Sequence, residues 1–141
     1  MIKKTIITHR FIKNEDLNHH GTLYAGRCAE WFIESGLLAA AYFLPPENIV
    51  CVKLHGMKFS KPVRLGVALR FESRIAYAGK SSLVAHVRVV LEEEEILHGF
   101  ISFVNVDGEG KAFPHGLTLE NLSEEEKQLE AQAREVHRKR D

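Results

Sequence analysis

Residues 16–43, DLNHHGTLYAGRCAEWFIESGLLAAAYF, constrain the fold of this chain more than any other stretch. Apolar residues recur there at three- and four-residue spacing and also fill the neighbouring face, which predicts a helix buried nearly all round. Pro45 and Pro46 follow, and proline lacks an amide hydrogen and disfavours helical geometry in the preceding residue. We therefore predict one long helix over residues 23–44, around which the other elements pack.

Two carboxylates interrupt this apolar pattern. Glu30 and Glu34 lie one turn apart on the predicted helix. A carboxylate on a largely buried helix needs a partner or a chemical role, because burying an unpaired charge is costly. We expect at least one of them to face a cavity or a subunit boundary.

The composition limits the classes of partner. The 141 residues indicate one domain, and 19 basic against 19 acidic residues predict no nucleic-acid partner and no anionic membrane surface. The N-terminal residues lack the apolar core of a signal peptide, and no apolar run approaches the ~20 residues that span a bilayer. The two cysteines, Cys28 and Cys51, form no disulfide framework and are typical of a reducing compartment. We expect a cytoplasmic protein.

Alternating apolar residues predict five strands, with a helix near the C-terminus. The strands are expected over residues 4–12, 48–59, 67–77, 83–91 and 96–106. Gly56 suggests a bulge or a close approach, and the four glutamates at 92–95 are expected to form a solvated hairpin tip. Ser123 and Glu126 have capping-box spacing and predict a charged helix that extends to about Arg138.

These elements together predict an α+β fold in which a curved antiparallel sheet wraps the long helix. We expect a single domain over residues 1–118. Residues 119–141 are expected to form a charged, helical C-terminal tail at the periphery.

Several motifs occur in an order typical of one family. Residues 16–26, DLNHHGTLYAG, are followed by Trp31 and Glu34, and further pieces lie at residues 57–63, 79–82 and 103–107. Over residues 8–112 this ordered set resembles the hotdog-fold acyl-CoA thioesterases.

The resemblance implies a hotdog fold and hydrolysis of an acyl-CoA to a free acid and coenzyme A. It also implies a homodimer joined edge to edge, with shared active sites, or a larger assembly such as a tetramer or hexamer. We expect no cofactor and no metal, since coenzyme A enters as part of the substrate. In this family an asparagine precedes the helix and an acid lies on it; Asn18 matches the asparagine, whereas the acid position falls on Ile33, next to Glu34.

The chemistry of thioester hydrolysis suggests roles for these residues. Glu34 can act as the base, and Asn18 can orient the water or the acyl carbonyl. Unpaired amide groups near Gly26, at the start of the helix, can stabilise the oxyanion. The other interpretations are an ion pair of Glu34 across a dimer interface, with Glu30 as the reserve carboxylate, and a capping role for Asn18.

The coenzyme A end of the substrate needs cations and hydrogen-bond donors. Gly79, Lys80, Ser81 and Ser82 can form a cradle for its phosphates, with added charge from Lys61. The same four residues also fit an ordinary hairpin turn. No histidine or cysteine has the spacing of a zinc site.

Two other functions remain compatible with the sequence. Isoleucine at the acid position favours a non-catalytic acyl-CoA sensor on the same fold. A dehydratase is disfavoured, since the expected histidine in a glycine-proline loop is missing. The sequence does not indicate the length of the acyl chain.

Overall fold

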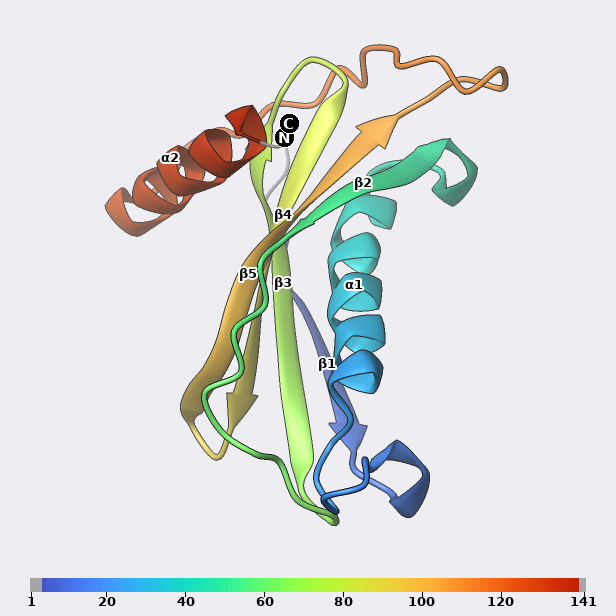
Figure 1. The fold of residues 1–141 in the computed structure, drawn as a ribbon. Helices are drawn as coiled ribbons and strands as arrows, with labels where there is room; N and C mark the ends of the chain where they lie inside the picture. The colour runs from blue at the N-terminus through green and yellow to red at the C-terminus, as the bar shows by residue number, and fades with distance from the viewer. Residues whose placement is uncertain (1–3, 140–141) are drawn as a thin grey trace.

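A curved, five-stranded antiparallel sheet forms the body of the protein in the computed structural model, which describes residues 4–139 (Figure 1). The strands are β1 (Ile6–Phe11), β2 (Ile49–His55), β3 (Ala68–Ala78), β4 (Ser82–Leu91) and β5 (Glu94–Asn105), in the order β1-β3-β4-β5-β2. The three longest strands occupy the centre, and β1 and β2 are the two edges. Short 3₁₀ helices at Asn14–Asp16 and Pro46–Asn48 precede the long helix and β2.

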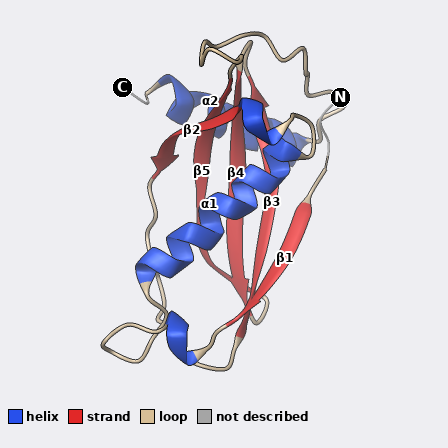
Figure 2. Ribbon diagram, turned by 90° about the vertical axis from the view of Figure 1, so that its right-hand side faces the viewer, coloured by secondary structure: helices blue, strands red, loops and turns tan. Residues whose placement is uncertain are grey.

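The two α-helices lie on opposite faces of this sheet. Helix α1 (Ala25–Ala41) crosses the concave face, and α2 (Glu124–Arg138) lies on the other side (Figures 1 and 2). Together they confirm the predicted fold, a long helix wrapped by a curved sheet with a peripheral C-terminal helix. The Ser123 capping box at the start of α2 is also confirmed, with Ser123 Oγ accepting from Glu126 N–H at 3.1 Å and Glu126 Oε1 from Ser123 N–H at 2.9 Å.

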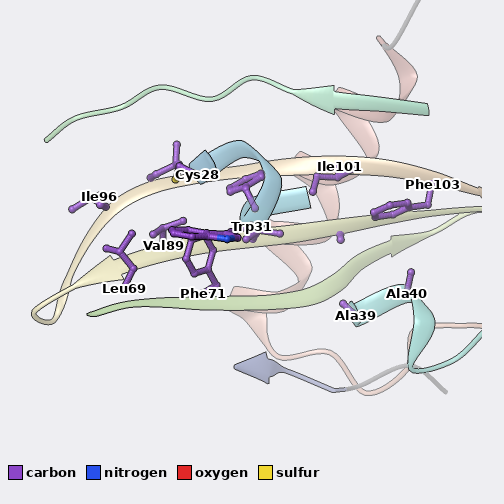
Figure 3. Close-up of a cluster of buried hydrophobic side chains, with 14 of the residues drawn as sticks. Cys28, Trp31, Ala39, Ala40, Leu69, Phe71, Val89, Ile96, Ile101 and Phe103 are labelled. Atoms are coloured by element: carbon purple, nitrogen blue, oxygen red, sulfur yellow. The ribbon is translucent and has the colours of Figure 1, made fainter. Parts of the chain in front are cut away.

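The main core lies between α1 and the concave face (Figure 3). Trp31 of α1 meets Phe71 of β3 edge to face, with ring centroids 6.2 Å apart. Alternate residues of β4, including Val87 and Val89, face the same core and are fully buried, as the alternation predicts. Gly99 of β5 has no room for a side chain, because a Cβ there would lie 2.9 Å from the carbonyl oxygen of Gly56.

A smaller core fixes α2 to the convex face. Ala133 of α2 is fully buried against Ala76, Val84 and Phe100 of the three central strands. The rest of α2 is highly charged, so this narrow apolar stripe is what holds the helix against the sheet.

The predicted long helix is shorter and less buried than its pattern suggested. It ends at Ala41 instead of residue 44, and the next residues form a turn before the two prolines. Leu37 and Leu38 are 36% and 40% exposed, so a single chain does not bury the helix all round. The helix has more apolar surface than one curved sheet can cover.

Two local predictions for the strands were right only in part. Only Glu92 and Glu93 form the β4–β5 turn, both with positive φ, while the other two glutamates of the run begin β5. The bulge in β2 falls between Cys51 and Lys53, and Gly56 follows the strand with a φ of +73°. A left-handed glycine ends β2 here, so residues 56–59 leave the sheet.

No helix within residues 4–139 is long and apolar enough to cross a membrane. The predicted domain and tail also include residues 1–3 and 140–141, which lie outside the described residues.

Candidate active site

An apolar pocket of about 340 Å³ lies beside the first turn of α1. Its walls come from three separate segments, namely the loop before α1 together with the first turn of that helix, residues 59–63 and the start of β5. Cys28, Val63, Ile96 and Leu97 are buried and form its floor, whereas Ser60 and Lys61 are exposed at its rim. Two residues predicted for the site, Asn18 and Lys61, therefore line one cavity.

The loop that carries Asn18 is fixed by its backbone. Leu17 pairs with Leu23 across the loop, and Asn18 N–H donates to the Thr22 carbonyl at 2.7 Å. The Asn18 side-chain oxygen accepts from His20 N–H at 2.8 Å and from Thr22 N–H at 3.2 Å. Because the oxygen is occupied in this way, the amide NH₂ group is the part of Asn18 that can donate to a ligand.

Asp16 ties this loop to the helix, a role that we did not predict. Its carboxylate is almost fully buried, accepts from Lys13 N–H at 2.9 Å and pairs with Arg27 Nε at 3.2 Å. Its carbonyl oxygen accepts from Tyr24 N–H at 2.8 Å. A buried carboxylate with these partners holds the start of α1 at a fixed position relative to Asn18.

The first turn of α1 offers backbone donors next to the pocket. Arg27 and Cys28 N–H both bond to the Tyr24 carbonyl, at 3.0 and 3.1 Å. The amides of Ala25 and Gly26 precede these bonds, and the first amides of a helix have no intrahelical acceptor. A side chain at Gly26 would overlap the Tyr24 ring in its present position, and this exposed ring would have to move to make room for it.

Both carboxylates of α1 are ion-paired and exposed. Glu34 pairs with Arg10 of β1, and Glu30 pairs with Arg27 at 3.4 Å. Neither lines the pocket that contains Asn18. Within one protomer, the structure therefore does not bring Glu34 together with Asn18.

The predicted phosphate cradle lies at the other end of the sheet. The loop that carries Asn18 lies near the start of β3, where Leu23 N–H donates to the Val63 carbonyl. Residues 79–82 lie beyond the other end of this 11-residue strand. At about 3.3 Å per residue the two regions are roughly 33 Å apart. Lys80 is exposed, while Ser82 is 8% exposed.

Polar residues also collect on the convex face. A second cavity of about 440 Å³ lies between α2 and the central strands, lined in part by Glu72, Arg74, His86 and Arg88. Burial, together with the nearby His98, Arg74 and Arg88, lowers the pKa of His86 to about 4. His86 Nε2 lies 3.2 Å from His98 Nδ1.

His55, the last residue of β2, lies outside the pocket. Its Nε2 is 2.7 Å from the buried hydroxyl of Ser102, which in turn lies 3.0 Å from His137 Nδ1 of α2. Within residues 4–139, no group of three histidine, cysteine or acidic side chains is placed to hold a metal ion.

Comparisons with known proteins place these observations in context. The family model described as the thioesterase superfamily matches residues 20–97. An uncharacterized acyl-CoA thioester hydrolase, YkhA of Bacillus subtilis (strain 168), is 27% identical over 116 residues, which cover 78% of this chain and 67% of that protein.

Solved structures give the same picture of the fold. An apo-hexameric acyl-CoA thioesterase has a TM-score of 0.83 at 28% identity, over 96% of this chain and 91% of that one. An acyl-CoA hydrolase from Bacillus cereus has a TM-score of 0.87 at 23% identity, over 96% of this chain and 85% of that one.

Proposed function

This chain belongs to the thioesterase superfamily, and on that basis we propose that it hydrolyses the thioester of an acyl-CoA to a free acid and coenzyme A. One observation supports placing this activity at a particular site. Asn18, with its side-chain oxygen already engaged, lies on an apolar pocket beside the start of α1. Such a site can hold an acyl group and polarise its carbonyl.

The reaction follows from these donors. The Asn18 NH₂ group and the Gly26 amide hold the thioester carbonyl oxygen, and this oxygen gains negative charge as water attacks the carbonyl carbon. The carbon–sulfur bond then breaks and coenzyme A leaves as a thiolate. A cysteine thiol has a pKa of about 8.5, and a thiol of this kind leaves with little help from an acid. One water proton passes through the base to the departing sulfur.

For the base we propose Glu34 of the partner subunit, acting on the site that contains Asn18. Two features support a dimer through β2: within residues 4–139 this edge strand pairs only with β5, and it exposes Val50 and Val52 at 44% and 43%. Unpaired strand edges with apolar side chains favour pairing with a second copy. A two-fold axis would then create two equivalent sites, each with residues from both chains.

The coenzyme A phosphates would lie outside the pocket, next to exposed cations. Lys61 lies at the rim and forms an ion pair with Glu94, and both side chains are exposed. The turn formed by Gly79, Lys80, Ser81 and Ser82 lies far from that rim in its own chain. In a two-fold dimer joined edge to edge, the partner's strands run in the opposite direction. The partner's turn would therefore lie at the same end of the joined sheets as this pocket.

We place this activity in the cytoplasm, with no metal and no resident cofactor. Cys28 and Cys51 are both free thiols, as expected of a reducing compartment. Hydrolysis of a thioester requires only water, a base and donors to the oxyanion, all of which side chains and backbone supply.

A non-catalytic acyl-CoA sensor is the second candidate. Ile33 at the family's acid position, together with the ion pairs made by both helix carboxylates, favours it. A thiol-release assay across short, long and aromatic acyl-CoAs separates the two functions. We expect turnover of at least one acyl-CoA. Tight binding in calorimetry with no thiol release from any acyl-CoA would identify the sensor and overturn the hydrolase.

A further inference from the structure

The pocket that contains Asn18 lies within a single protomer and has a closed, apolar floor. Cys28, Val63, Leu97 and Ile96 are only 2%, 5%, 5% and 7% exposed. Burial raises the pKa of the Cys28 thiol to about 12, so it contributes a neutral, weakly polar surface. A charged or strongly hydrated group would lose its water there without a new partner.

The position of Asn18 decides which part of the substrate enters this pocket. If the thioester carbonyl is held at Asn18, the acyl chain and the coenzyme A extend from it in opposite directions. Next to the sulfur, coenzyme A carries a pantetheine arm whose two amides would lose their hydrogen bonds to water on a buried apolar floor, and its phosphate charges lie beyond this arm. The acyl chain is the only part of the substrate that fits it.

We infer that this pocket binds the acyl chain and limits its length to straight, uncharged chains of up to roughly ten carbons. This inference rests on the proposed hydrolase function. A cavity of about 150 Å³ holds the six carbons of benzene, so the ~340 Å³ here holds roughly a dozen such groups, thioester included. Leu97 of β5, which is buried, and Ala25 of α1, which is exposed, both line the pocket.

Chain length provides the first test. Each methylene that leaves water for the pocket should raise kcat/KM about fourfold, the factor expected for burying one CH₂ group. The rise should stop near ten carbons, and longer chains should be hydrolysed no faster or more slowly. A rise that continues unchanged to sixteen carbons would overturn the inference. Absence of thiol release from every acyl-CoA would instead reject the hydrolase function itself.

Two substitutions should move the limit in opposite directions. Ala25→Leu adds three carbons at an exposed position, so it should shorten the preferred chain by about three carbons without disturbing the core. Leu97→Ala removes three carbons from the floor and should lengthen it by about as much. The matched control is Ala41→Leu, at the other end of α1 and outside the pocket, which should keep the wild-type profile.

The readout is kcat/KM against chain length for each variant, with thermal unfolding to show that it is folded. If Leu97→Ala does not fold, Ala25→Leu alone still decides the question. An unchanged chain-length profile in folded, active Ala25→Leu enzyme would place the acyl chain elsewhere and overturn the inference.

Discussion

Glu34 of α1 is ion-paired with Arg10 of β1, on the opposite edge of the sheet from β2. The Arg10 guanidinium also lies over the Trp31 ring, 5.4 Å from its centroid, which helps to fix its position. A carboxylate held in this way serves either as a structural link or as a base that is released from Arg10 when substrate binds. Mutagenesis can separate these two roles.

The first prediction concerns the base itself. Glu34→Gln keeps the shape of the side chain but removes the charge, so kcat should fall about 10²- to 10⁴-fold. Arg10→Gln breaks the same ion pair and leaves the carboxylate, so it should retain most activity. The exposed pair should contribute no more than about 1 kcal/mol to stability. If both variants lose activity equally, the pair is structural, and if only Glu30→Gln is inactive, Glu30 is the base.

The second prediction concerns the shared site. Mixed dimers of Asn18→Ala and Glu34→Gln chains would contain one site with both residues intact and one with neither. Co-refolding the two nearly inactive variants should therefore restore up to about half of the wild-type activity per mixed dimer. Mixed dimers that are confirmed by mass yet remain inactive would show that each site is built within one chain.

The sequence predicted the elements of this fold better than it predicted the site. Periodicity placed α1 and all five strands within a few residues, because alternation and helical spacing report directly on which face is buried. It did not predict that Phe59 and Leu97 would line one pocket together with Asn18. The pocket brings together segments far apart in the chain, and no local pattern encodes it.

The residues around Asn18 show the same limit. The Asp16–Arg27 ion pair spans eleven positions across the loop before α1, so helical spacing could not reveal it. The glycine, lysine and serine residues at 79–82 fit a phosphate cradle or an ordinary hairpin turn, and the family resemblance is what favours the cradle. Whether they touch the substrate depends on a second subunit, which a single chain does not define.

A third prediction compares the two proposed phosphate contacts. Lys61→Ala and Lys80→Ala should each weaken the binding of free coenzyme A several-fold and flatten its salt dependence, since each removes one exposed charge. The chemical step should be unaffected, so single-turnover rates at saturating substrate should stay near wild type. Lys127→Ala on α2, with an equally exposed lysine, is the control. If either variant binds coenzyme A as tightly as this control does, the lysine substituted in that variant is not part of the site.

A fourth prediction follows from His86, which is 9% exposed beneath α2. Its pKa is lowered from 6.5 to about 4, first by burial and then by the nearby His98, Arg74 and Arg88. Between these two values the unfolded chain binds the proton and the folded chain does not. Stability should therefore fall as the pH drops from about 6.5 to 4, by up to ~3 kcal/mol from this residue.

Urea unfolding at pH 7, 5 and 4 measures this effect. His86→Gln cannot titrate, so its stability should change less over the same range than that of the wild type. The exposed His20→Gln variant should behave as the wild type does. Equal pH dependence in His86→Gln and wild type would show that other groups cause the loss.

The most direct measurement is thiol release by Asn18→Asp. Aspartate keeps the oxygen that accepts from the His20 and Thr22 amides, so the loop should hold its shape, but it cannot donate to the thioester carbonyl. Loss of one oxyanion donor predicts a kcat about 10²- to 10³-fold lower, with thermal unfolding close to wild type. A folded Asn18→Asp enzyme that hydrolyses acyl-CoA at the wild-type rate would contradict the role assigned to Asn18.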